Sequence, residues 1–320
     1  MDRSEDELLA AIARVLSGAG PEVIVGVGDD AAVLAPPAGE QVLTTDALVE
    51  GTHFELGRTS AHDLGAKAIA VNVSDVAAMG ASPRAALCAL TLSDAVDAAW
   101  VMELFGGMRE ACDEYALWLV GGNLARGTDV SIVVTVTGEV APGRAVLRSG
   151  ARVGDRLVVT GTLGASAAGL RIARTVRAPD PEQLELVRVH LRPTARLGEG
   201  ALLARHGATA MLDVSDGLGL DLGRLCAASG VGARIDTRSV PVADGATRAE
   251  AFAGGEDYEL LATMPSDEAI DAANRDLQQG FGVALTRIGV IIEEGLIAVD
   301  DDGVPRPLEA EGWDHFDAGR

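Results

Sequence analysis

Short acidic motifs set among glycine, serine and threonine are the residues of this chain that could do chemistry. Five of them recur along the sequence, at residues 26–30, 44–46, 72–75, 213–217 and 254–257. Most adjoin apolar runs, so we expect them where buried elements end. Carboxylates gathered at such places repel one another unless a cation lies between them, and hard divalent cations prefer oxygen ligands. Magnesium held by carboxylates usually completes its shell with water and substrate phosphates, so the pattern predicts phosphate chemistry.

Each motif taken alone has a simpler interpretation, because aspartate beside glycine or serine is ordinary in turns. Residues 26–31 match the dinucleotide-binding pattern GxGxxA in form, but two carboxylates would occupy the turn that should wrap a pyrophosphate. The chain contains no GxxxxGK[ST] sequence, which excludes a P-loop. The glycine-rich stretch 161–166 either binds a phosphate or only begins a helix. Five motifs together favour a metal site.

Composition limits the class of protein and its partners. The chain has 320 residues, of which 48% are hydrophobic and 3% aromatic, so we expect two domains with aliphatic cores. The net charge of −22 argues against nucleic acid or an anionic membrane surface as a partner. No apolar run approaches the ~18 residues that cross a bilayer. Because residues 1–7 are acidic and polar, unlike a targeting segment, we expect a cytoplasmic protein.

The three cysteines give no sign of metal or redox chemistry. Cys88, Cys112 and Cys226 are far apart in apolar surroundings, and no CxxC pair exists. This usage is typical of a reducing compartment and predicts buried, unreactive thiols. Lys67 is the only lysine, which we interpret as a compositional bias.

Hydrophobic periodicity indicates an α/β protein of two domains. In the first half, helices are predicted around residues 8–16, 61–79 and 97–117, and strands at 23–27, 41–45, 83–92, 118–121 and 129–140. In the second half, strands are predicted at 156–160, 209–213, 258–263, 284–292 and 296–299, with helices after 161–166 and at 218–228. Turn residues between 141 and 153 mark a boundary, so we expect domains at 1–145 and 146–320.

One predicted helix carries an acid where an apolar residue is expected. Asp75 continues the stripe formed by Leu64, Ala68 and Val71, and Asn72 lies three residues before it on the same face. A carboxylate on an apolar stripe is costly unless it faces a site. The pattern therefore predicts that Asp75 faces a site.

Two basic side chains near the motifs have both structural and functional interpretations. His53 would usually be a structural histidine, but it follows Asp46 closely and is a candidate substrate contact. Arg148 is either a surface charge or a phosphate ligand. The chain has no GxSxG sequence and no metal-spaced His/Cys pair, which is expected if positioning and charge neutralisation do the work of phosphoryl transfer.

As a set, these segments resemble the thiamine-monophosphate kinase family. The matching segments are 26–32 (GVGDDAA), 44–46 (TTD) with 50–54 (EGTHF), 67–81, 213–218 (DVSDGL), 254–260 (GGEDYEL) and 312–316 (GWDHF). They follow the family's order over nearly the whole chain. Several are shared in outline with the wider aminoimidazole ribonucleotide synthetase superfamily. Their combination with segment 50–54, which contains His53, and segment 312–316, which contains Trp313, is more specific to the kinases.

The resemblance implies a reaction and a set of site residues. The reaction is direct in-line transfer of the ATP γ-phosphate to thiamine monophosphate, with no covalent nucleophile or general base. The implied ligands of several Mg²⁺ ions are Asp30, Thr44, Thr45, Asp46, Asp75, Asn123, Asp213 and Asp216. The implied ATP contacts are Gly122, Asn123, Arg148 and Ser215, and the implied thiamine contacts are His53, Glu256 and Trp313.

The resemblance also implies a homodimer. In the implied fold, the amino-terminal α/β domain binds ATP and metal and contributes strands to a dimeric barrel. The carboxy-terminal domain is a mixed-sheet α/β domain.

Elementary chemistry agrees with this reaction. A phosphate monoester has its second pKa near ~6, so it is largely dianionic at neutral pH and needs no base. The obstacle is repulsion between this dianion and the ATP phosphates, which magnesium can remove. Thiamine also carries a fixed positive charge, which suits the carboxylate of Glu256 and the aromatic face of Trp313.

One residue departs from the family pattern and leaves alternatives open. The family's Gly-Gly-Asp motif is here Gly121-Gly122-Asn123, and an amide brings no charge to a metal, so we expect weaker binding of one magnesium with activity retained. One alternative is an inactive protein that binds nucleotide or thiamine phosphate. Another is an ATP-dependent synthetase or a selenophosphate synthetase, although the latter uses a reactive residue near its amino terminus and the first cysteine here is Cys88.

Overall fold

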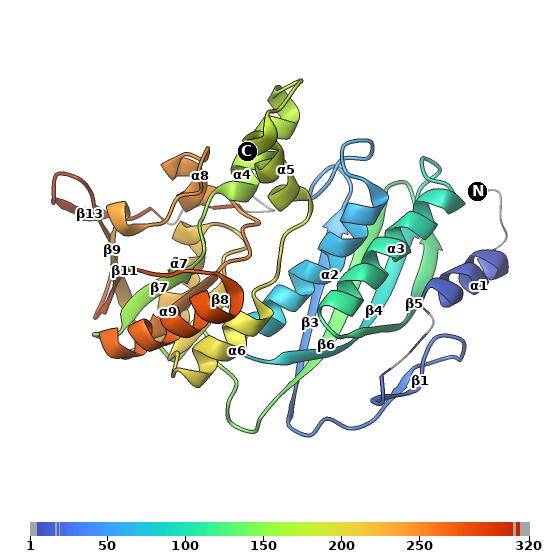
Figure 1. Cartoon of the computed structure of the whole chain (residues 1–320), viewed down its shortest axis with the longest axis horizontal. Coiled ribbons are helices and arrows are strands. Elements are labelled where there is room, and N and C mark those ends of the chain that lie inside the picture. Colours follow the sequence, from blue (N-terminus) through green and yellow to red (C-terminus); the bar gives the residue numbers. More distant parts are fainter. Residues whose placement is uncertain (1–4, 17, 19, 310–311, 314–320) are drawn as a thin grey trace. The chain divides into compact units, whose positions relative to one another are not determined.

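The chain folds into two compact units (Figure 1). The computed structural model describes residues 5–16, 18, 20–309 and 312–313. The first unit comprises residues 1–76 and 81–143, and the second comprises residues 77–80 and 144–320. None of the helices in the described part of the chain is long and apolar enough to cross a membrane.

A four-stranded sheet in the order β3-β6-β4-β5 forms the centre of the first unit. Its strands are β3 (Glu40–Val49), β4 (Ser82–Leu92), β5 (Trp118–Arg126) and β6 (Ser131–Val140). β6 pairs antiparallel with both β3 and β4, whereas β4 and β5 are parallel. A parallel pair needs a crossover connection, which here contains α3 (Ala98–Glu114). The remaining elements are α1 (Glu5–Val15), the hairpin of β1 (Val23–Val25) and β2 (Val33–Leu34), and α2 (Ala61–Ala78).

Helices cover one face of this sheet and leave the other open. α2 and α3 lie over the covered face (Figure 1), on which Ile132, Val134 and Val136 of β6 are at most 1% exposed. The register places Leu43 of β3 and Leu87 of β4 on the opposite face, where they are 64% and 46% exposed. An antiparallel sheet with one uncovered face usually alternates apolar and polar residues, so large exposed leucines on the open face are unusual.

Glycines allow the two covering helices to approach each other closely. A Cβ atom added to Gly65 of α2 would lie 2.0 Å from the carbonyl oxygen of Leu104 in α3. One added to Gly107 of α3 would lie 1.8 Å from the carbonyl oxygen of His62 in α2. Each helix therefore contributes a glycine to a close backbone contact, and this contact fixes the position of α2.

The second unit is built on a seven-stranded mixed sheet in the order β13-β12-β9-β11-β7-β10-β8. The strands are β7 (Arg156–Thr160), β8 (Ala210–Asp213), β9 (Gly232–Asp236), β10 (Leu260–Met264), β11 (Leu285–Ile292), β12 (Leu296–Val299) and β13 (Pro305–Pro307). The helices are α4 (Ala165–Thr175), α5 (Pro181–Leu191), α6 (Leu197–Arg205), α7 (Leu218–Ser229), the 3-10 turn η1 (Thr237–Ser239), α8 (Arg248–Ala253) and α9 (Asp267–Phe281). β9 and β12 are parallel, and the other strand pairs of the described sheet are antiparallel.

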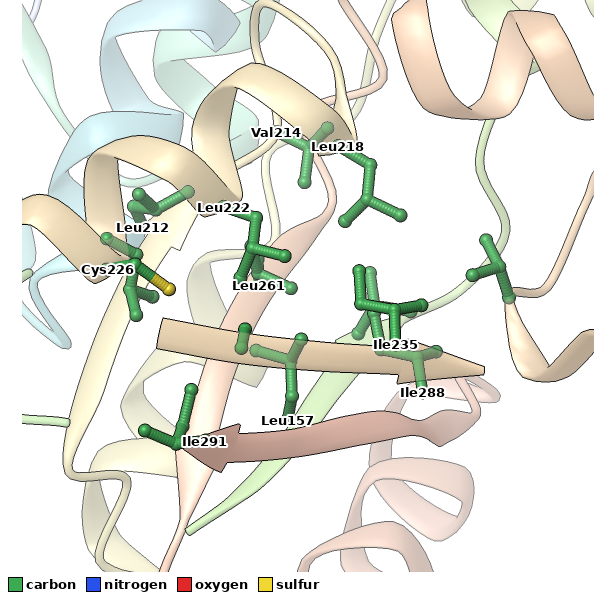
Figure 2. Packing of buried hydrophobic residues seen from close by; sticks show 14 of the residues in the cluster. Leu157, Leu212, Val214, Leu218, Leu222, Cys226, Ile235, Leu261, Ile288 and Ile291 are labelled. Atoms are coloured by element: carbon green, nitrogen blue, oxygen red, sulfur yellow. The ribbon is translucent and has the colours of Figure 1, made fainter. Parts of the chain in front are cut away.

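Aliphatic side chains fill both faces of this sheet. Figure 2 shows one face, where Leu218, Leu222 and Cys226 of α7 pack over strand residues such as Leu261 and Ile288. On the other face, α9 buries Ile270, Ala273 and Leu277 against β7, β10 and β11. Burial on both faces explains why β8 and β10 are apolar at nearly every position rather than alternating.

Most elements predicted from periodicity are confirmed, although several boundaries are wrong, and two of these concern site motifs. We expected the motif 44–46 at the end of a strand, but β3 continues to Val49, so the motif lies inside the strand. Likewise β5 continues through residues 121–123 to Arg126. The short strand β9 and the helices α5, α6, α8 and α9 were not predicted.

The cysteines are free and buried, as predicted. Burial raises the pKa of the Cys88 and Cys112 thiols to about 12 and that of Cys226 to about 11. Because the thiolate is the reactive form, these groups should be unreactive at neutral pH.

Candidate active site

In the first unit, the threonine motif of β3 meets the acid of α2. Thr44 Oγ1 donates a hydrogen bond of 2.5 Å to Oδ2 of Asp75, a half-buried residue. Asp46 lies two residues after Thr44 and therefore on the same face of the sheet. The prediction that Asp75 faces a site stays a prediction, and the structure shows its carboxylate bound to the Thr44 hydroxyl.

The Gly-Gly-Asn motif of β5 lies in the same part of the sheet. Register pairs connect Asp46 to Val134, Val134 to Cys88 and Cys88 to Gly122, so Gly122 shares a row and a face with Asp46. A Cβ atom added to Gly122 would lie 1.9 Å from the carbonyl oxygen of Cys88. Only glycine fits at this position without a shift of the backbone.

Two of the predicted metal ligands lie on the other face of the sheet. Thr45 Oγ1 donates to the carbonyl oxygen of Val134 at 3.1 Å and lies 3.0 Å from Thr135 Oγ1. Asn123 pairs with Ala89 on this open face and is exposed. Within the first unit, the sheet separates these two side chains from Thr44 and Asp75.

The remaining predicted residues of the first unit lie in loops. Asp30 is exposed in the loop between β1 and β2, where its backbone N–H donates to Asp29 Oδ1 at 2.8 Å. His53 follows β3, and its Nδ1 accepts a 3.0 Å hydrogen bond from the backbone N–H of Val49. This bond fixes the orientation of the imidazole ring.

In the second unit, three segments that are far apart in sequence lie side by side. Val214 N donates to Glu259 O at 2.8 Å, and Glu256 N donates to Ser215 O at 2.7 Å. Trp313 N donates to Asp216 O at 2.9 Å. These backbone bonds bring together four predicted site residues, namely Ser215, Asp216, Glu256 and Trp313.

The backbone of this loop cluster is unusual, as is common at functional sites. Glu256 and Tyr258 have positive φ angles of 66° and 52°. Such conformations cost non-glycine residues about 1–3 kcal/mol each and persist where the surroundings impose them. A Cβ atom on Gly255 would lie 2.6 Å from the carbonyl oxygen of Ser215, so glycine is needed for the two loops to meet.

Two residues that the sequence did not indicate hold the loop after β8. Asp221 Oδ2 accepts hydrogen bonds from the backbone N–H groups of Ser215 at 3.1 Å and Asp216 at 2.9 Å. Asp221 Oδ1 accepts a 2.6 Å bond from Arg224, which also pairs with the Asp216 carboxylate. Asp221 is 2% exposed, and burial raises the pKa of its carboxyl group. A sequence signal existed, because Asp221 lies among buried leucines of α7.

The glycine-rich stretch 161–166 begins a helix and already holds an anion of the protein itself. The Asp257 carboxylate accepts from Gly164 N at 2.7 Å and from Ser166 N at 3.2 Å at the start of α4. Burial raises the pKa of Asp257 to about 7, although the two N–H donors oppose this shift. Because a side chain occupies these N–H groups, the structure favours a helix start over a phosphate site.

Buried polar partners flank the Glu256 loop on two sides. His190 Nδ1 lies 3.4 Å from Glu256 Oε2 and 3.0 Å from Ser166 Oγ. Arg196 binds the Glu259 carboxylate through two hydrogen bonds, of 2.5 and 2.9 Å. Although burial acts to lower it, the neighbouring carboxylates raise the pKa of the Arg196 guanidinium. The loop is thus anchored by His190 and by the Arg196–Glu259 pair.

Arg148 lies in a segment beside β8, and Asp213 lies in β8 itself. Leu147 O accepts a hydrogen bond from Met211 N at 3.2 Å, so the segment containing Arg148 runs beside β8. Arg148 itself is exposed. Asp213 ends β8 and is 4% exposed.

The predicted metal ligands have the chemistry that magnesium prefers. The donors are carboxylate, hydroxyl and amide oxygens, with no cysteine or histidine among them, which suits a hard cation. Within the described residues, no group of three or more His, Cys, Asp or Glu side chains could hold a metal ion as it stands.

Comparison with known protein families shows the superfamily of this chain. The amino-terminal domain model of AIR synthase related proteins matches residues 28–140, and the carboxy-terminal domain model matches residues 152–302. The chain therefore has the two-domain α/β fold of that superfamily.

Closer relatives define the family. Thiamine-monophosphate kinase of Escherichia coli K12 is 41% identical over 310 residues, covering 92% of this chain and 93% of that protein. The crystal structure of thiamine-monophosphate kinase from Stenotrophomonas maltophilia has a TM-score of 0.80 at 36% identity, covering 93% of this chain and 95% of the other. The structure of AaThiL complexed with AMPPCP and TMP has a TM-score of 0.77 at 34% identity, covering 98% and 97%. The chain belongs to the thiamine-monophosphate kinase family.

Proposed function

We propose that this protein transfers the γ-phosphate of ATP to thiamine monophosphate, giving thiamine diphosphate and ADP. The observation that supports this most strongly is the convergence of Ser215, Asp216, Glu256 and Trp313 in the second unit. These residues come from the segments through which the chain resembles its family. A relative of 34% identity binds AMPPCP, an ATP analogue, together with TMP.

The chain's own residues would act by binding and orienting two anionic substrates. Thiamine monophosphate is largely dianionic at neutral pH, so its oxygen attacks without a general base. Mg²⁺ ions, when bound, neutralise the charge between this dianion and the ATP phosphates. The residues that would hold them are Asp30, Thr44, Thr45, Asp46, Asp75, Asn123, Asp213 and Asp216. Gly122, Arg148 and Ser215 would contact ATP.

The thiamine end requires a different kind of contact. Its cationic ring suits the Glu256 carboxylate, which the left-handed backbone and His190 hold in place. Trp313 is 43% exposed, so its ring is accessible to a substrate beside Asp216. We also propose His53 as a substrate contact.

We also propose that the protein is a homodimer formed through the open face of the four-stranded sheet. Leu43 and Leu87 on this face are 64% and 46% exposed, and two such sheets facing each other would form a barrel. Thr45 and Asn123 lie on the same face. A metal contact from either side chain would therefore be made at or near the interface.

A charged residue on this face should prevent the proposed dimer. Leu87→Glu is expected to give a monomer at micromolar concentration, because an unpaired carboxylate would be buried. Light scattering of the wild type, Leu87→Glu and the control Leu184→Glu, at an exposed leucine of α5, checks this. A wild type with the mass of a single chain would contradict the proposal.

ATP-dependent synthesis of a coenzyme requires a compartment in which ATP is abundant, so we propose that the protein is cytoplasmic. The three free thiols fit a reducing compartment.

The acceptor requirement tests the proposed reaction. The purified protein with ATP and Mg²⁺ should release ADP when thiamine monophosphate is added, with thiamine diphosphate formed in equal amount. Thiamine, selenide and ribonucleotide acceptors of the synthetase type serve as comparisons. Binding of thiamine monophosphate without ADP release would favour an inactive binding protein, and turnover with another acceptor alone would favour a synthetase.

A further inference from the structure

Arg224 of α7 lies between two carboxylates of the second unit. Its Nη1 donates to Asp216 Oδ2 and, at 2.6 Å, to Asp221 Oδ1. The Asp221 side chain is 3% exposed, that of Asp216 is 23% exposed and that of Arg224 is 40% exposed. The arginine therefore covers an accessible acid while it remains attached to a buried one.

Asp221 divides its two oxygens between two tasks. Oδ2 accepts from the backbone N–H groups of Ser215 and Asp216, and these bonds fix the loop. Oδ1 accepts from Arg224. If Arg224 left Asp216, the bonds to Oδ2 would still hold the loop, and Oδ1 would still hold the arginine.

The charges explain why this arrangement matters for a cation. Asp216 and Asp221 together carry two negative charges, and Arg224 compensates one of them. A divalent cation that binds Asp216 through Oδ2 competes with the guanidinium for that oxygen, and one that binds through Oδ1 is repelled by the guanidinium charge. The free energy of metal binding therefore includes the cost of separating Arg224 from Asp216.

We propose that Arg224 is a displaceable counter-ion of Asp216, which neutralises this acid when no metal is bound and which a divalent cation must replace. The inference rests on the proposed function, in which Asp216 is a metal ligand. It makes Arg224 and Asp221 positioning residues that set the affinity for metal. Free metal only competes with Arg224. Metal bound to ATP also brings phosphates, with which the released guanidinium can pair. The arrangement therefore favours binding of metal together with nucleotide.

Direct measurement of metal binding in the absence of nucleotide tests this inference. Mn²⁺ is titrated into the whole protein and followed by its electron paramagnetic resonance signal. Arg224→Gln should bind Mn²⁺ about two- to tenfold more tightly than the wild type, the range expected for losing one partly exposed charge competitor. Arg224→Lys, which keeps the charge but lacks the planar fork, should fall between the two. The matched control is Arg234→Gln, at an exposed arginine of β9.

A second readout depends on the same competition. Without metal, Arg224→Gln should melt at a lower temperature than the wild type, because Asp216 loses its counter-ion. Saturating Mn²⁺ should remove most of this difference, since metal binds the native state preferentially. A deficit that Mn²⁺ leaves unchanged would indicate a structural role alone and would overturn the inference.

Asp216→Asn separates failure of the inference from failure of the proposed metal site. If this variant weakens Mn²⁺ binding while Arg224→Gln leaves it unchanged, Asp216 is a ligand and the proposed role of Arg224 as its counter-ion is wrong. Weaker binding by Arg224→Gln would likewise overturn the inference. If Asp216→Asn has no effect on Mn²⁺, both the ligand assignment and the inference fail.

Discussion

Asp213→Asn is expected to lower kcat/KM for thiamine monophosphate by about 10²–10³-fold, the usual cost of removing one preorganised charge from a transition state. Asparagine has nearly the same shape as aspartate, so the buried end of β8 should fold normally, while the charge that would hold a cation in the proposed function is lost. Asp75→Asn should have a similar effect, because Asp75 is the acid of the first unit that Thr44 orients. Steady-state kinetics over a range of Mg²⁺ concentrations measure both.

A matched control shows whether position rather than charge matters. Asp236 of β9 pairs with Arg238 and belongs to none of the acidic motifs. Asp236→Asn should retain kcat/KM within about twofold, since a surface substitution away from the acidic motifs usually has a small effect. If Asp213→Asn behaved like this control, the assignment of Asp213 as a metal ligand would be wrong.

Glu259→Gln is expected to lower the free energy of unfolding by about 2–4 kcal/mol, because it leaves the Arg196 guanidinium without its main partner in a buried site. The Glu259 side chain is 6% exposed and the Arg196 side chain 22% exposed. Thr160 Oγ1 also donates to Glu259, and Glu199 lies 3.4 Å from Arg196 as a weaker partner. The melting temperature should fall by roughly 5–12 °C.

An exposed ion pair provides the comparison for this stability effect. Glu185 pairs with Arg188 on α5, with side chains 57% and 54% exposed. Glu185→Gln should change the free energy of unfolding by less than ~0.5 kcal/mol, since water and salt screen such pairs. Denaturant unfolding of both variants checks the difference. Equal effects would mean that burial of the Glu259 pair has no energetic consequence.

The part of the site that sequence could predict depends on local patterns. Asp75 was recognisable because a carboxylate interrupts an apolar helical stripe, and burial of a charge requires a reason. The Ser215–Asp216 turn was recognisable because it follows a short apolar strand. Periodicity likewise predicted α2, α3 and α7, whose buried faces repeat at helical spacing.

The part that sequence could not predict depends on contacts between distant segments. Asp257 holds the start of α4 from 93 residues away, and no local pattern reveals that pairing. The strand register fixes the side of the sheet on which Thr45 and Asn123 lie. A register shift of one residue would move both side chains to the opposite face. The roles of Asp221 and Arg224 needed the geometry of the turn that they hold.

The central claim is that neighbouring acids of the predicted motifs bind the same metal ions. A double-mutant cycle on Mn²⁺ affinity in the presence of AMPPCP tests it, using Asp213→Asn, Asp216→Asn and the double variant, all within the second unit. If both side chains bind the same ion cluster, the double variant should deviate from additivity by more than about 0.5 kcal/mol. Effects that add within ~0.3 kcal/mol would show two independent sites and would contradict the claim.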